Sequence, residues 1–152
     1  MLSTIVTLTD EQIKSLPNTP VEILPAPGGN KMFVPVFAVF TLDAIGGAYT
    51  NLDTDPLPYL LLAPDDFEAE LTNYALGMPA TTATKRTIVV TYSQKAMTSG
   101  ALETSVIGTD EPSVNLFNQN ICIWANNNAG NFEGGDPANT LTITVYYVIV
   151  DL

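Results

Sequence analysis

The sequence predicts an all-β fold, namely a single-domain β-sandwich or jelly roll with one or two short helices. Hydrophobic residues make up 46% of the 152 residues and charged residues only 14%, and the strand formers Thr, Val, Tyr and Phe are prominent. Turn signals recur about every ten residues, which is the spacing of sandwiches and jelly rolls and not of βαβ units. In the segment Asn139–Asp151, Leu141, Ile143 and Val145 alternate with threonines, which is the period of a half-buried strand.

Two long segments are predicted to be central strands. After Val145 the final segment is apolar on both faces, and so is Lys31–Asp43. Pro35 lies inside the second of these segments and indicates a bulge or a sheet edge, because proline lacks the N–H of a ladder hydrogen bond. Strands that are apolar on both faces need cover on both sides. That cover comes from a second layer of the same chain or from another subunit.

Residues 1–30 are predicted to form an N-terminal Pro-rich arm with a short helix, and residues 31–152 to form the β-sandwich domain. Ser3–Leu8 has the composition of a strand, and Val21–Leu24 is a candidate edge strand. The prolines of the arm hold the chain extended and block ladder pairing. We expect the arm to lie over the surface and to reach a neighbouring subunit. These prolines are Pro17, Pro20, Pro25 and Pro27.

Two helices are predicted from capping and periodicity. Thr9 and Gln12 have the spacing of a capping box, so a helix of about two turns begins here and ends before Pro17. Pro64–Gly77 shows the helical period, since apolar residues such as Phe67 and Leu71 fall on one face.

The remaining segments are predicted to be short strands and turns. Gly46 and Gly47 lie in a predicted turn, where glycine can take positive φ at little cost, and Tyr49–Asp55 is expected to be a loop. The other predicted strands are Leu57–Leu62, Arg86–Tyr92 and Asn120–Ala125, with weaker strands at Gly100–Thr109 and Ser113–Phe117.

Composition excludes several classes of function. Sixteen acidic residues face five basic ones, for a formal net charge of −11. Such a chain is repelled by nucleic acid; the alternative explanation of the acidity is that it keeps an apolar chain soluble. There is no histidine and only one cysteine, Cys122, so His-dependent nucleophile pairs and thiolate metal clusters are excluded. No apolar run has the length of a membrane span and no signal peptide is recognised. We expect no cofactor, no nucleic-acid partner and no membrane partner.

No residue pattern points to catalysis or to a metal centre, so the candidate site residues are those of binding surfaces. The loop Asn126–Asp136 is rich in side-chain oxygens and glycine, which favours ordinary turn chemistry and leaves calcium or glycan binding as the alternative; its candidates are Asn127, Asn128, Asn131 and Asp136. The surplus of apolar strand faces predicts a subunit interface in a homo-oligomer. Its candidate residues are Tyr146, Val148, Val150, Phe33 and Phe37.

Both ends of the chain resemble a known family. The runs VTLTDEQIKSLPNTPVEILPAPGGNKMFVPV and GGAYTN, together with the ending GGDPANTLTITVYYVIVDL, resemble virion structural proteins of tailed bacteriophages. The resemblance implies a jelly-roll-like β-sandwich of the capsid decoration or cement type, bound as a trimer to the major capsid protein. It also implies synthesis in the bacterial host cytoplasm and a final location on the outer capsid surface.

Three functions remain open at this stage. A decoration protein binds heads stoichiometrically and stabilises them without turnover. A tail or fibre-associated module binds host surface glycans, and the Asn-rich loop is its candidate site. An enzyme such as a wall hydrolase is disfavoured, because the sequence lacks His and lacks carboxylates at the spacing that glycoside hydrolysis requires.

Overall fold

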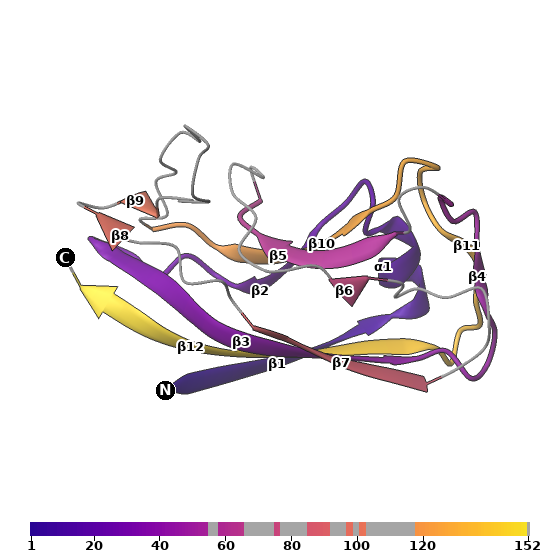
Figure 1. Ribbon diagram of the computed structural model, residues 1–152, viewed down its shortest axis with the longest axis horizontal. Coiled ribbons are helices and arrows are strands. Elements are labelled where there is room, and N and C mark those ends of the chain that lie inside the picture. The colour runs from indigo at the N-terminus through magenta and orange to yellow at the C-terminus, as the bar shows by residue number, and fades with distance from the viewer. Residues whose placement is uncertain are drawn as a thin grey trace.

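The computed structural model describes residues 1–54, 58–65, 75–76, 85–91, 97–98, 101–102 and 118–151. Two four-stranded antiparallel sheets face each other, and a short helix lies at one end of the sandwich (Figure 1). In chain order the elements are β1 (Leu2–Thr9), α1 (Asp10–Ser15), β2 (Val21–Leu24), β3 (Lys31–Asp43), β4 (Tyr49–Thr50), β5 (Tyr59–Ala63), β6 (Ala75–Leu76), β7 (Lys85–Thr91), β8 (Met97–Thr98), β9 (Ala101–Leu102), β10 (Ile121–Asn126), β11 (Glu133–Gly134) and β12 (Thr140–Asp151).

The strand order is that of a jelly roll. The first sheet has the order β1-β12-β3-β7 and the second β2-β10-β5-β6. The strands of the first half of the chain pair with those of the second half in reverse order, as in one long antiparallel hairpin. The pairs are β1 with β12, β2 with β10, β3 with β7 and β5 with β6. This hairpin is rolled up, so that β12 also pairs with β3 and β10 with β5. The topology matches a double-sheet jelly roll, which confirms the predicted fold class.

The core lies between the two sheets. Leu141, Ile143 and Val145 of β12 are fully buried, as the alternation in the sequence predicts, and they face the second sheet with its buried Leu62 and Ile123. Burying a side chain of this size stabilises the fold by about 1.5–3 kcal/mol. The alternate residues of β12, by contrast, are half-buried or exposed.

Strands β3 and β12 form the central pair of the first sheet, which confirms the prediction for both segments. Their register runs from Thr140 opposite Asp43 to Asp151 opposite Lys31. A bulge lies beside Pro35, since Tyr146 pairs with Phe37 but Tyr147 pairs with Pro35, which leaves Val36 as the extra residue.

The last residues of β12 are less buried than the sequence predicts. Val148 is 37% exposed and Ile149 is 42% exposed, although the apolar pattern predicts cover on both faces. The fold therefore leaves part of this apolar strand open to contact from outside.

The N-terminal residues are part of the sandwich and do not form a separate arm. β1 pairs with β12 along its whole length, and α1 buries Ile13 together with the following Leu16. The four prolines lie on either side of β2 and not inside it, so Val21–Leu24 is free to pair with β10 at the edge of the second sheet. Thr9 caps α1 through the predicted capping box with Gln12.

Two local predictions need correction. The helix predicted at Pro64–Gly77 is wrong at Ala75 and Leu76, which form β6 because they pair with β5; residues 66–74 and 77 lie outside the described residues. Tyr49 and Thr50 form β4 and not a loop, since they pair with β11. The weak strand at Gly100–Thr109 is described only at β9, and Ser113–Phe117 lies outside the described residues.

Candidate functional site

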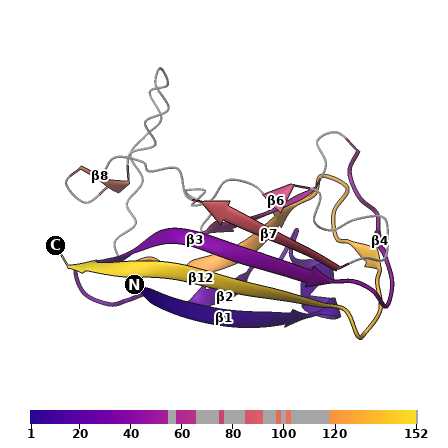
Figure 2. The ribbon, with the colours of Figure 1, turned by 60° about the horizontal axis from the view of Figure 1, so that its bottom comes forward.

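One face of the first sheet points away from the core, and it is the candidate functional surface. Figure 2 shows this sheet in front, with β1, β12, β3 and β7 side by side. The register places every second residue of each strand on this side, and these residues are exposed or half-buried. We call this surface the outer face; it consists of Ser3, Ile5, Thr7, Phe37, Val39, Thr41, Thr87, Val89, Thr142, Thr144, Tyr146 and Val148.

The outer face is organised in rows that cross the four strands. One row consists of threonines only, and their hydroxyl groups pair across neighbouring strands. The Oγ1 atoms of Thr7 and Thr142 are 3.1 Å apart, and those of Thr41 and Thr87 are also 3.1 Å apart. Cross-strand threonine pairs of this kind stabilise a sheet and keep its surface flat and uncharged.

The next two rows, toward the end of β12, are mostly apolar. Ile5 and Val89 occupy the two ends of one row and are 67% and 60% exposed. In the next row the rings of Phe37 and Tyr146 stack with centroids 4.2 Å apart and an interplanar angle of 18°. Large exposed apolar side chains gathered on one sheet face indicate a contact surface.

Charge is excluded from the outer face, although the chain carries a net charge of −11. None of its residues is charged, and the nearest charged row at its border is formed by Asp43 and Lys85. The Nζ atom of Lys85 lies 3.0 Å from Oδ2 of Asp43, and this hydrogen bond holds the pKa of Asp43 below its ordinary value. The border pair is therefore neutral as a unit.

The predicted interface residues divide into two groups. Phe37, Tyr146 and Val148 lie together on the outer face. Phe33 does not, because it is buried at 8% exposure and packs edge-to-face against Tyr147 with ring centroids 5.2 Å apart. Val150 is half-buried, lies opposite Met32 and packs partly against the core.

Ile5, Val36 and Val89 are exposed apolar residues of the same sheet that sequence reasoning missed. Each is ordinary in its own strand, and only the register between distant strands brings them together. The bulge at Pro35 was the one available signal for Val36, since a bulge residue lacks a partner in the ladder.

The Asn-rich loop is held by hydrogen bonds within the loop and to neighbouring segments. Asn127 is buried, and its Nδ2 donates to the carbonyl oxygens of Asn51 and Gly130 at 2.9 and 2.6 Å. Asn131 accepts a hydrogen bond from Asn18 at 2.7 Å. Asp136 accepts one from the backbone N–H of Ala138 at 2.8 Å, whereas Asn128 is exposed. Glycan or calcium binding by this loop stays a prediction.

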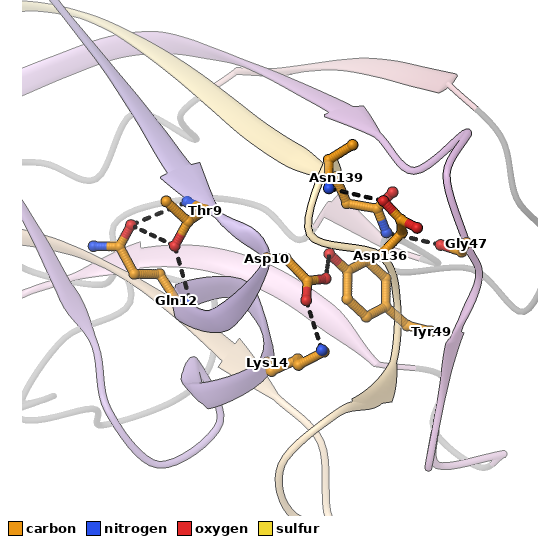
Figure 3. A network of polar contacts seen from close by, with 9 residues as sticks. Thr9, Asp10, Gln12, Lys14, Gly47, Tyr49, Asp136 and Asn139 are labelled. Carbon is orange, nitrogen blue, oxygen red and sulfur yellow. Dashed lines mark hydrogen bonds and ion pairs between the residues drawn. The ribbon is translucent and has the colours of Figure 1, made fainter.

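A buried polar cluster joins three segments at the helical end of the sandwich (Figure 3). The carboxylate of Asp10, at the start of α1, is only 3% exposed. It accepts a 2.9 Å hydrogen bond from the Tyr49 hydroxyl and pairs with Nζ of Lys14 at 2.5 Å. Burial raises the pKa of the Tyr49 hydroxyl, Asn139 opposes this rise and Asp10 reinforces it. Tyr49 is therefore a hydrogen-bond donor throughout the ordinary pH range.

Glycines allow these segments to approach closely. Gly135 has φ of 73°, and a methyl group at this position would collide with the Asp10 carboxylate and come within 2.8 Å of the Tyr49 ring. Gly46 and Gly47 do not have positive φ. They are needed for space, because a methyl group on Gly46 would lie 2.8 Å from the Asp136 side chain.

The segments that carry the family resemblance therefore meet in one place. TDEQ contributes Asp10, GGAYTN contributes Tyr49, and GGDPAN contributes Gly135 and Asn139. Nδ2 of Asn139 donates to the carbonyl oxygen of Gly47 at 2.8 Å, while within the described part of the chain its buried Oδ1 accepts no hydrogen bond. These motifs serve the architecture of the sandwich.

Two further observations concern metals and membranes. Among the described residues, no three His, Cys, Asp or Glu side chains are grouped so that they could hold a metal ion. The described residues also contain no helix with the length and hydropathy of a bilayer span.

Comparison with known proteins gives weak similarities to two virus particles. No protein-family model matches the sequence, and no curated protein matches it. A chain of the cyanophage Pam1 capsid asymmetric unit is 14% identical with a TM-score of 0.42, over 96% of this chain and 81% of that chain. A chain of the KBV activated particle at acidic pH is 11% identical with a TM-score of 0.33, over 98% of this chain and 69% of that chain. Neither similarity is strong enough to transfer a function.

Proposed function

We propose that this chain is a non-enzymatic structural protein of a phage virion that decorates the outer surface of the capsid as a homotrimer. Its partners are the major capsid protein and other copies of itself. Two lines of support lead to this function: the resemblance of both chain ends to phage virion structural proteins, and the neutral outer face of a jelly-roll sandwich.

The outer face is the observation that carries the proposal. The cores of protein interfaces are depleted in charged residues and enriched in aromatic ones. In this acidic chain the surface around Phe37, Tyr146 and Val148 combines both properties, with a stacked aromatic pair and no charged side chain. We assign the contact between subunits of the trimer to this surface.

The size of the outer face fits such a contact. Four strands about 4.8 Å apart and about eight residues of about 3.4 Å each span a plane of roughly 500 Å². A stable interface buries about 800 Å² of accessible surface per partner. This accessible surface follows the side chains and is therefore larger than the flat area of the same sheet. The outer face thus supplies the larger part of one interface and needs further contacts at its border.

Decoration acts through binding energy alone. A protein that binds only the assembled shell stabilises it by RT ln(1 + [L]/Kd), which is about 2.7 kcal/mol when the free protein is at 100 times its Kd. A trimer that contacts several capsid subunits gains further from its multiple attachment points. The net charge of −11 suits the outside of the shell, because DNA inside it repels acidic protein.

The test adds purified protein to heads assembled without it. We expect saturable binding with a fixed number of copies per head and a higher temperature of head disruption. Val148→Asp should weaken both effects, because it places a charge on the outer face. Ile45→Asp is the matched control, since Ile45 is 65% exposed in the connection between β3 and β4 and lies off this face.

Failure to bind heads would overturn the proposal. Binding to isolated tails, or a glycan-dependent attachment to host cells that Asn128→Ala abolishes, would favour the tail-associated module instead.

A further inference from the structure

Among the described strands, β1 forms an uncovered edge of the first sheet. It lies at one end of that sheet, and within the described residues it pairs with β12 alone. Its sequence, LSTIVTLT, contains no charged residue and no proline, and its pairing with β12 shows no register shift. Leu2 and Ile5 are 50% and 67% exposed. An uncharged, regular edge strand of this length is a template for pairing with another strand.

The other edges carry the usual protective features. β2, an edge of the second sheet, has only four residues, includes Glu22 and lies between Pro20 and Pro25. β7, at the opposite edge of the first sheet, begins with Lys85 and Arg86. Short length, charge and flanking proline all discourage edge-to-edge association. Among the long edges that the structure describes, β1 is the one that lacks all three.

We propose that β1 pairs in antiparallel fashion with β1 of a second copy of this chain, about a two-fold axis at Ile5. The two first sheets then join into one sheet of eight strands. Such a contact is isologous, because each copy offers the same strand and residue i faces residue 10 − i. Pairing of this kind is β-strand addition, in which backbone hydrogen bonds provide the affinity.

The side chains of β1 suit this register. Ile5 faces Ile5, Ser3 faces Thr7, Thr4 faces Val6 and Leu2 faces Leu8, so every pair is matched in polarity or β-branching. Paired residues differ by an even number of positions, so each lies on the same side of the sheet as its partner. Along an edge strand, every second residue points its backbone N–H and C=O away from the sheet. In this register, such residues of one copy face such residues of the other copy.

The pairing extends the outer face across the two-fold axis. In each copy, the row that contains Ile5 continues through Thr144 and Val39 to Val89. The two exposed Ile5 side chains become neighbours and shield each other from water. Two copies with a net charge of −11 each repel one another. A contact through β1 adds least to this repulsion, because β1 carries no charged side chain.

The pairing stands apart from capsid binding, because it involves only copies of this chain. On a capsid, however, a two-fold contact between neighbouring trimers would link them into a continuous net. Cementing would then come from contacts between decoration proteins as well as from contacts with the shell.

Cysteine cross-linking tests the pairing in the purified full-length protein. A disulfide requires Cα atoms within about 7 Å. Ile5→Cys should form disulfide-linked dimers under mild oxidation at least tenfold faster than Ile45→Cys, which is similarly exposed and lies off both β1 and the outer face. Unsubstituted protein measures the background from Cys122, which is buried.

The register is tested by mixing two variants. Ser3→Cys and Thr7→Cys should cross-link with each other, whereas each alone should not, since two copies of the same position lie about 14 Å apart along the strands. Equal rates for Ile5→Cys and Ile45→Cys would overturn the pairing, and so would self-linking of Ser3→Cys as fast as its linking to Thr7→Cys. Head binding that persists without these cross-links would refute the pairing alone and leave the proposed function intact.

Discussion

The hydrogen bond from Tyr49 to Asp10 offers a sharp test of how the helical end of the sandwich is held. Tyr49→Phe removes the hydroxyl that donates to this buried carboxylate at 2.9 Å and leaves the shape of the side chain almost unchanged. A hydrogen bond to a charged group is worth about 1.5–3 kcal/mol. We therefore expect the free energy of unfolding to fall by about 2 kcal/mol at pH 7, and the melting temperature to fall by about 4–8 °C.

The pH dependence of this difference has a defined sign. The pKa of Tyr49 is raised in the folded state, so the folded protein holds this proton more tightly than the unfolded chain does. The stability that the hydroxyl contributes is complete below the ordinary tyrosine pKa of about 10 and is lost at higher pH, at up to about 1.4 kcal/mol per pH unit. The gap between the wild type and Tyr49→Phe should therefore narrow above pH 10.

Urea denaturation at a fixed protein concentration measures both effects, because oligomerisation makes stability depend on concentration. Tyr146→Phe is the matched control, since it removes the same hydroxyl from a half-buried tyrosine on the outer face. Equal losses for the two variants at pH 7, or a gap that stays constant from pH 8 to pH 11, would refute the role given to Tyr49 and Asp10.

Other substitutions probe the remaining features. Gly135→Ala should destabilise the fold more than Gly130→Ala in the same urea assay. Both glycines have positive φ, at 73° and 94°, which costs about 1–2 kcal/mol for alanine, but only alanine at position 135 also clashes with its neighbours, at a cost of about 1–3 kcal/mol. Equal losses of stability in the two variants would contradict the close packing at Gly135. Thr9→Ala should cost about 1 kcal/mol through loss of the helix cap, and no change in the urea midpoint would argue against the capping box. Val148→Asp should dissociate the oligomer in light scattering while circular dichroism stays unchanged, whereas Ile45→Asp should leave the oligomer intact; a Val148→Asp protein of unchanged mass would remove the outer face from the subunit contact.

The central pair of strands was predictable because its signal is local. The alternation in Thr140–Val145 and the apolar faces of Lys31–Asp43 lie within single segments, and Pro35 marks the bulge directly. The jelly-roll order was predictable only as a class, since strand order depends on pairings between segments such as β1 and β12 that are far apart in the chain.

Errors arose where tertiary contacts override local signals. The prolines were taken to make residues 1–30 an arm over the surface, but they constrain only their own positions and leave β1 and β2 free to pair within the sandwich. Ala75 and Leu76 have a helical pattern around them, yet they pair with β5. Local propensity decides little where a strand edge is available for pairing.

The candidate surface was only partly predictable for the same reason. Phe37, Tyr146 and Val148 were found from the surplus of apolar positions in two strands. Phe33 was assigned to the interface because strict alternation places it on the same face as Phe37. The bulge at Val36 reverses this alternation and turns Phe33 toward the core. The contact between Asp10 and Tyr49 had no signal at all, since a buried carboxylate and a buried tyrosine are recognisable only once the fold brings them together.

The most direct test of the proposed function is a three-dimensional reconstruction of heads with and without this protein. We predict difference density on the outer surface of the shell, with three-fold symmetry and with volume for three jelly-roll domains at each site. Difference density confined to the tail, or heads that are identical in the two reconstructions, would contradict a decoration role.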